Sequence, residues 1–186
     1  MKLEIYKEAV KRTIKDLGSK ALNDFHMVVG MHSEFNELYD AIWGKDANLV
    51  NLQEEIIDGC WYSTNYANLQ NIEINEIFSF QDELYYDLDE TWAGENYYEQ
   101  LEYAYSKLTN LVKREHIYGK VISLEDKTEA IIEIFKRIND VCIHFNLNVE
   151  EGMEKNINKL KVRYPEKFSN WDALNRNLEE EYKQLK

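Results

Sequence analysis

Hydrophobic residues recur at three- and four-residue spacing along most of the chain, with charged and amide side chains between them. This period is typical of amphipathic α-helices. It predicts seven helices joined by short turns, near residues 4–17, 20–43, 49–70, 96–117, 124–146, 149–162 and 170–185. Residues 72–95 are acidic and aromatic with less regular spacing, so a connector, a short helix and a lid all stay open for them.

Residue types that cap helices precede or open several of these segments. Their side chains accept hydrogen bonds from the first free backbone N–H groups of a helix. The single proline and seven glycines leave few of the turn signals that many short strands need. The pattern and the composition together predict an all-α fold, with caps at Ser19, Asn48, Ser123, Asn148 and Ser169.

The chain also repeats itself at one constant offset, without a gap. Residues 42–58 (IWGKDANLVNLQEEIID) align with residues 117–133 (IYGKVISLEDKTEAIIE) on both sides of a shared Gly-Lys turn. Chance similarity between two acidic helices is the alternative, but matched flanks favour duplication. The copies, approximately residues 22–70 and 97–145, would each form a helical hairpin. We therefore expect a single domain over residues 1–186, with a four-helix-bundle core and additional terminal helices.

The net charge of −13 narrows the set of partners. It argues against a broad basic surface for nucleic acid, so an acidic protein that handles nucleotides needs a cation as intermediary. No stretch approaches the roughly 18 uninterrupted apolar residues of a membrane span, and the N-terminus has no apolar core of signal-peptide type. We expect no nucleic-acid partner, no membrane and a cytoplasmic location.

Two pairs of carboxylates on consecutive predicted helices are the main candidate chemistry. Glu34 and Glu37 share one helix face, and Glu55 and Asp58 share a face of the next helix. A lone pair of this kind usually decorates a solvated face. Both pairs lie in largely apolar sequence, however, and a hairpin would bring four carboxylates together, where they repel one another unless a cation intervenes. Mg²⁺ prefers such hard oxygen ligands. At the offset of the repeat, the second copy carries Thr109, Val112 and Ala130 in place of the three glutamates.

These residues resemble the all-α nucleoside triphosphate pyrophosphohydrolases, the superfamily of MazG-like proteins and dimeric dUTPases. The family pattern is E-x-x-E followed by E-x-x-D, and FHMVVGMHSEFNELYDAIW and EEIIDGCWY are similar to its two motif helices. NLNVEEGMEKNINKLKVRYPEKF is similar to the closing helix, in which an Asn and a Lys precede an Arg-Tyr-Pro ending. The resemblance covers about 22–70 and 113–168. The chain departs from the family at Ile57, where a glycine is usual, and at Asn36, where a small residue is common.

The resemblance implies hydrolysis of a (deoxy)nucleoside triphosphate to the monophosphate and pyrophosphate, with Mg²⁺ as cofactor, in the control of nucleotide pools. It assigns metal binding and catalysis to all four acids, and we take Glu37 as the general base because of its central position. Asn156, Lys159 and Arg163 would contact phosphate, although basic residues at a helix C-terminus also complement the helix dipole. The family builds its sites from more than one subunit, so a homodimer or a higher homo-oligomer is expected.

For the base of the nucleotide, the candidates are aromatic and amide groups near the acids: His26, Trp43, Tyr62 and Asn65. The two aromatic residues among them are equally well explained as core residues. A phosphate-binding glycine loop, a dinucleotide fingerprint and a nucleophile elbow are absent from the sequence.

Two other functions stay open at this point. The first is a catalytically inactive helical module that binds a nucleotide or a protein, suggested by the missing acids of the second copy. The second is a mimic of nucleic acid that occupies a basic partner, suggested by the net charge and the acidic segment 82–102.

Overall fold

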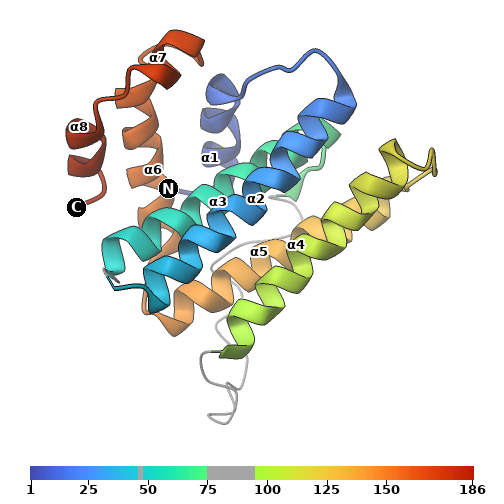
Figure 1. The fold of residues 1–186 in the computed structure, drawn as a ribbon, viewed down its shortest axis with the longest axis horizontal. Helices are drawn as coiled ribbons and strands as arrows, with labels where there is room; N and C mark the ends of the chain where they lie inside the picture. Colours follow the sequence, from blue (N-terminus) through green and yellow to red (C-terminus); the bar gives the residue numbers. More distant parts are fainter. Residues whose placement is uncertain (46–47, 75–94) are drawn as a thin grey trace.

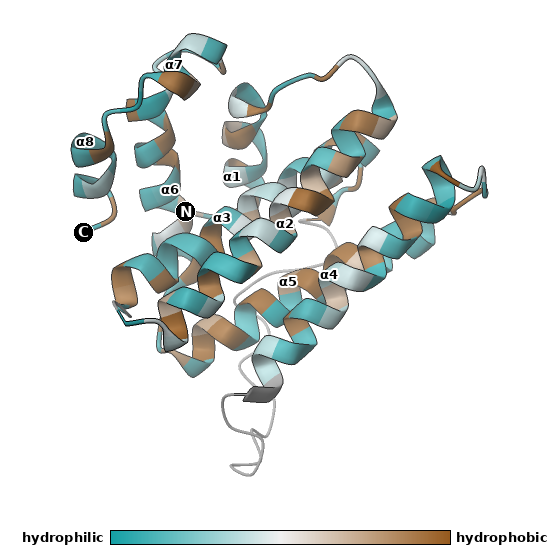
Figure 2. Cartoon of the chain, in the orientation of Figure 1, coloured by the Kyte–Doolittle hydropathy of each residue, from teal (hydrophilic) through white to brown (hydrophobic). Residues whose placement is uncertain are grey.

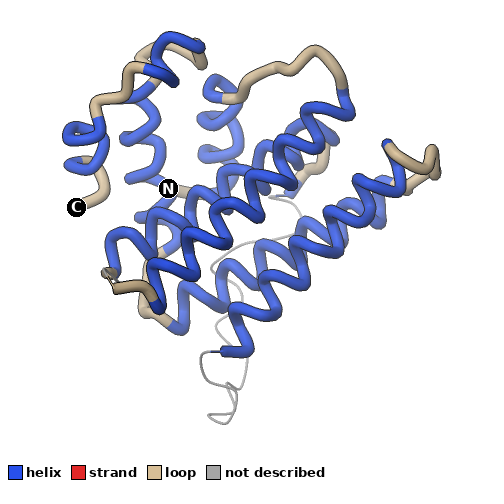
Figure 3. Tube along the Cα trace, in the orientation of Figure 1, coloured by secondary structure: helices blue, strands red, loops and turns tan. Residues whose placement is uncertain are grey.

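The computed structural model describes residues 1–45, 48–74 and 95–186, and every regular element in these ranges is helical (Figure 3). The elements are α1 (Leu3–Val10), the short 3₁₀ turn η1 (Lys11–Thr13), α2 (Lys20–Trp43), α3 (Leu49–Gln70), α4 (Glu95–His116), α5 (Leu124–His144), α6 (Val149–Arg163), α7 (Asn170–Leu174) and α8 (Leu178–Lys183). The predicted all-α fold class is confirmed. Residues 75–94, most of the segment whose role the sequence leaves open, lie outside the described ranges.

Helices α2 to α5 form the four-helix core as two hairpins (Figure 1). Helix α2 packs against α3 and α4, and α5 packs against the same two helices. Helices α1 and α6 contact α3 and each other, and α8 contacts α6. The terminal helices therefore gather on the α3 side of the bundle, as Figure 1 shows. The predicted bundle with additional terminal helices is confirmed.

The two hairpins keep the offset seen in the sequence. The offset pairs Lys20, the first residue of α2, with Glu95, the first residue of α4. It also pairs Leu49, the first residue of α3, with Leu124, the first residue of α5. Asn48 and Ser123, which the same offset aligns, cap α3 and α5. This correspondence agrees with a duplication, but both the duplication and the single domain stay predictions.

Bands of apolar and polar residues alternate along the helices (Figure 2). The apolar side chains turn inward, and Met31, Leu38, Ile56, Leu108 and Phe135 are almost completely buried in the shared core. All five predicted caps are confirmed, because each accepts a hydrogen bond from a first-turn N–H group: Ser19 from Leu22, Asn48 from Asn51, Ser123 from Asp126, Asn148 from Glu151 and Ser169 from Asp172.

The first predicted helix is too long. Regular α-helix ends at Val10, and Ile14 is extended. Contacts with a distant part of the chain fix this segment: the Arg12 guanidinium donates to the carbonyls of Tyr164 and Glu166, both at 2.7 Å. These long-range bonds outweigh the local helical pattern, so the prediction of helix over residues 14–17 is wrong.

The last predicted helix, residues 170–185, is divided in two. Helix α7 ends at Leu174, and α8 begins at Leu178. Asn177 caps α8 by accepting from the N–H group of Glu180. Asparagine competes with helical hydrogen bonding and favours such ends, which accounts for the break.

A buried polar cluster joins the helices of the two hairpins. Asp24 on α2 is completely buried. Its carboxylate lies 2.6 Å from Lys20 Nζ, 2.7 Å from Gln70 Nε2 on α3 and 2.8 Å from His116 Nε2 on α4. Lys127 on α5 donates to Gln70 at 3.1 Å. Each core helix therefore contributes to one network.

Ile57, at the position where the resembled family has a glycine, is almost fully buried. It packs against Gly152 of α6, where an added Cβ would lie 2.7 Å from Ile57 Cγ1. A glycine on the facing helix thus makes room for the larger side chain. Within the described ranges, no helix is both long enough and apolar enough to cross a membrane.

Candidate metal centre and adjoining cavities

Carboxylates from α2 and α3 meet where the two helices pack. Glu34 and Glu37 lie one turn apart on α2 and face Glu55 on α3. One oxygen from each of these three glutamates lies within 4.8 Å of the others. Glu34 and Glu55 are partly buried, whereas Glu37 is exposed. The structure therefore brings together three of the four predicted acids.

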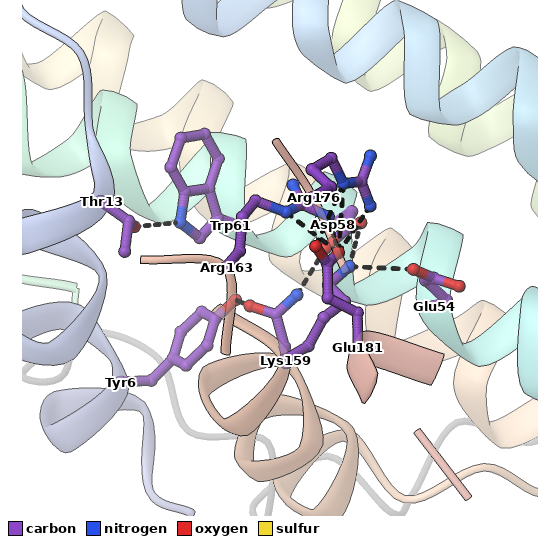
Figure 4. A network of polar contacts seen from close by, with 10 residues as sticks. Tyr6, Thr13, Glu54, Asp58, Trp61, Lys159, Arg163, Arg176 and Glu181 are labelled. Carbon is purple, nitrogen blue, oxygen red and sulfur yellow. Dashed lines mark hydrogen bonds and ion pairs between the residues drawn. The ribbon is translucent and has the colours of Figure 1, made fainter. Parts of the chain in front are cut away.

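The fourth acid, Asp58, is held from α6 (Figure 4). Asn156 Nδ2 donates to Asp58 Oδ1 at 2.5 Å, and Lys159 Nζ donates to Asp58 Oδ2 at 2.5 Å. Lys159 also donates to Glu54 at 3.1 Å, and the Tyr6 hydroxyl donates to Asn156 Oδ1 at 2.9 Å. Asn156 and Lys159, predicted as phosphate contacts, are almost completely buried and orient Asp58 in this structure.

The electrostatics of the cluster disfavour full ionisation. Burial and then the charges of Asp58 and Glu37 raise the pKa of Glu34 to about 7. Burial and then the charges of Asp58 and Glu34 raise the pKa of Glu55 to about 9. Burial raises both pKa values because it removes water from the charged form, and the neighbouring carboxylates raise them further by repulsion.

The three glutamates fit a small divalent cation. In octahedral coordination with bonds of about 2.0–2.1 Å, neighbouring ligand oxygens lie about 3 Å apart and opposite ones about 4 Å apart. The three oxygens already lie within 4.8 Å of one another, so small side-chain rotations would bring them to these spacings. Glu34, Glu37 and Glu55 are all oxygen donors, the type that Mg²⁺ prefers.

The cluster borders two cavities. The first measures about 150 Å³ and is lined by Glu34 and Asp58 from the acids. The second is more open, measures about 500 Å³ and is lined by Glu37 and Glu55. A ligand in the first cavity would therefore reach Glu34 and Asp58, and a ligand in the second would reach Glu37 and Glu55.

Cations and aromatic rings line the rest of the first cavity. Arg163 at the end of α6 and Lys15 before α2 supply positive charge. Trp61 and Tyr62 pack edge to face, with ring centroids 4.8 Å apart. The remaining lining residues are Thr13, His26, Leu160, Tyr164 and Phe168. Acids, cations and aromatic surface thus meet in one small space.

The ring of Tyr62 packs directly against Gly30 of α2. A Cβ added to Gly30 on α2 would lie 2.1 Å from Tyr62 Cε1. His26 is on the same face of α2, and its ring packs edge to face on Tyr62 at 5.9 Å. Burial and the charge of Lys15 lower the pKa of His26, which favours the neutral ring. Its Nδ1 atom is buried and has no hydrogen-bond partner among the described residues.

Of the predicted substrate-binding residues, Arg163, Tyr62 and His26 therefore line the first cavity. Trp43 and Asn65 line neither cavity. Trp43 is 46% exposed and packs against Tyr39 and Tyr98, with ring centroids 4.9 and 5.0 Å away. Asn65 is fully buried in α3, and neither atom of its amide has a hydrogen-bond partner among the described residues.

Sequence reasoning missed several residues of this region. Thr13 and Lys15 come from the segment that was predicted as helix, and Trp61 Nε1 donates to Thr13 Oγ1 at 3.0 Å. Glu181 on α8 accepts from Arg163 at 2.6 Å. These contacts join positions far apart in the chain, and no local pattern marks them. Only Tyr164 had a signal, because it belongs to the Arg-Tyr-Pro ending.

Comparisons of the chain with family models, with curated proteins and with solved structures find no match.

Proposed function

We propose that the chain hydrolyses a (deoxy)nucleoside triphosphate to the monophosphate and pyrophosphate, with Mg²⁺ held by Glu34, Glu37 and Glu55. The observation that carries this proposal is the cluster of these carboxylates beside a cavity that Glu34 lines together with cations and aromatic rings. A nucleoside triphosphate presents the complementary groups: a flat base, and phosphates that bind both metal ions and cationic side chains.

The carboxylates carry the chemistry in this proposal. Bound Mg²⁺ would polarise the phosphates and lower the pKa of a coordinated water. Glu37 is the exposed member of the trio and is therefore open to the attacking water, which supports it as the general base. Asp58 is oriented by Asn156 and Lys159, and this fixed geometry supports it as the fourth metal-binding acid.

The first cavity would bind the rest of the nucleotide. Arg163 and Lys15 are its cationic groups and would contact phosphate. Trp61 and Tyr62 offer ring surface for the base. His26 Nδ1, a buried polar atom without a partner among the described residues, would gain a hydrogen bond from a polar group of the base.

The test is a panel of canonical and modified nucleoside triphosphates incubated with Mg²⁺, with monophosphate and pyrophosphate quantified. We expect pyrophosphate release from one or a few nucleotides and its loss in Glu37→Ala. Glu129→Ala, which removes an exposed glutamate from α5, is the matched control and should retain activity. No turnover of any nucleotide would refute the enzyme. Binding without turnover would then favour the inactive nucleotide-binding module.

We also propose a homodimer or a higher homo-oligomer, as the family resemblance implies. Leu22 and Val29 support an assembly through α2, because they lie two turns apart on this helix and are 54% and 64% exposed. Light scattering coupled to size-exclusion chromatography measures the mass directly, and a monomer at micromolar concentration would contradict this proposal.

A further inference from the structure

Arg163 is held from outside the bundle by the C-terminal helix α8. Its Nε and Nη2 atoms donate to Glu181 Oε2 at 3.1 and 2.6 Å (Figure 4). Its third nitrogen, Nη1, has no hydrogen-bond acceptor among the described residues. One edge of the guanidinium is therefore bound, and its tip is left for another acceptor.

Glu181 is buried and is shared by two arginines. It is 2% exposed, and it also accepts from Arg176 Nη2 at 2.6 Å. A buried carboxylate is costly unless it is paired and hydrogen-bonded, and the two arginines satisfy that requirement. Two guanidinium groups share one carboxylate, so Arg163, Arg176 and Glu181 together keep a net positive charge.

Without Glu181, Arg163 would have other acceptors close by. Asp58 and Glu34 line the same cavity as Arg163. A guanidinium binds carboxylates readily in two-pronged geometry, so a released Arg163 would be drawn toward these acids. It would then compete for the oxygens that are proposed to hold the metal, and it would no longer be available for phosphate.

We propose that Glu181 is a positioning residue that holds Arg163 away from the acids, so that Nη1 binds a phosphate group of the ligand in the cavity. This inference rests on the proposed function and extends the site to α8, which lies outside the segments that resemble the family. Arg176 stabilises the ionised Glu181 and does not line the cavity.

The test measures the affinity for inorganic pyrophosphate in the presence of Mg²⁺ by isothermal titration calorimetry. Glu181→Gln should bind pyrophosphate about tenfold more weakly, because one charge-assisted contact is lost. The matched control is Glu180→Gln on the same helix, whose carboxylate pairs with Lys183 at 2.7 Å, and its affinity should equal that of the wild type. Circular dichroism verifies that each variant is folded.

A double-mutant cycle separates positioning from a structural role. If Glu181 acts through Arg163, Glu181→Gln causes no further loss of affinity in the Arg163→Gln background. An equal loss of pyrophosphate affinity in both backgrounds would overturn the proposal. A higher affinity of Glu181→Gln than of the wild type would also overturn it, because Glu181 would then keep Arg163 from binding pyrophosphate. Absence of pyrophosphate binding by the wild type would overturn it as well.

Arg163→Lys provides a second variant in case Glu181→Gln does not fold. Lysine keeps the charge, but it lacks the fork that bonds Glu181 and phosphate together, so affinity should again fall about tenfold. Unchanged affinity would overturn the proposal. Pyrophosphate binding requires no turnover, so an intact cycle without nucleotide hydrolysis would refute the enzyme and leave the positioning role standing.

Discussion

Lys159 Nζ lies 2.5 Å from Asp58 Oδ2 and 3.1 Å from Glu54 Oε1, and only 1% of the lysine side chain is exposed. Burial lowers the pKa of this ammonium group, but the charges of Asp58 and Glu54 outweigh that effect and raise it. Helix α6 thus supplies an internal counter-charge to Asp58 and Glu54. No described lysine or arginine forms an ion pair with Glu34, Glu37 or Glu55, so these three glutamates lack such a counter-charge.

Replacing Lys159 with methionine should destabilise the metal-free protein by about 2 kcal/mol or more, because Asp58 and Glu54 lose their partner in a partly buried site. Urea unfolding measures the loss. Lys155→Met is the matched control one turn earlier on α6, where the partner Glu151 is 59% exposed, and it should change stability by less than about 0.5 kcal/mol. Equal losses in the two variants would contradict the counter-charge role.

The stability of the metal-free protein should fall as the pH rises from about 5 to 9. The pKa values of Glu34 and Glu55 are raised to about 7 and 9 by burial and by neighbouring carboxylates. The folded state therefore binds more protons than the unfolded state in this range, and the free energy of unfolding decreases with pH. The penalty is absent below the unfolded pKa and complete above the folded pKa. Urea unfolding at a series of pH values measures this slope.

Two comparisons test the origin of that slope. Glu55→Gln should flatten it, because the residue with the larger shift no longer titrates, whereas Glu129→Gln on the exposed face of α5 should leave it unchanged. Saturating Mg²⁺ should raise the stability most at the alkaline end, where both glutamates are ionised. A slope that persists in Glu55→Gln at full size would assign the effect to other groups.

Gly30→Ala should destabilise the protein although alanine is the better helix former. The new methyl carbon would lie 2.1 Å from Tyr62 Cε1, so the ring or the helix must move. Overpacking of this kind costs about 1–3 kcal/mol, against about 1 kcal/mol gained in helix propensity. In a Tyr62→Ala background the same substitution should become neutral or stabilising, as measured by thermal unfolding. A destabilisation that is equal in both backgrounds would place the clash elsewhere.

The sequence predicts the central hairpin very well. The bounds predicted for α2 and α3, residues 20–43 and 49–70, match the observed helices, because a strong apolar period coincides with the caps Ser19 and Asn48. The meeting of Glu34, Glu37 and Glu55 also follows from local spacing, since helices joined by a short turn must pack against each other.

The contacts that define the rest of the site are not local. Lys159 and Asp58 are 101 residues apart, and no pattern within α6 shows that Lys159 points to an acid rather than to a ligand. The sequence does not predict the contact of Arg163 with Glu181 either, because the helix predicted over residues 170–185 is interrupted at Asn177, before Glu181. Periodicity gives the face of a helix, but the choice of partner depends on how the terminal helices pack.

Asp24→Asn should be the most destabilising of these single substitutions, at about 3–5 kcal/mol, because it removes a fully buried charge from three donors. The amide cannot accept from Lys20, His116 and Gln70 at once, and its own N–H group would face one of these donors. Urea unfolding checks the loss. Glu99→Gln is the matched control, since Glu99 aligns with Asp24 in the second copy of the repeat and is exposed. Asp24 lines neither cavity, so turnover per folded molecule should be retained. A loss below about 1 kcal/mol would show that the network is not what joins the two hairpins.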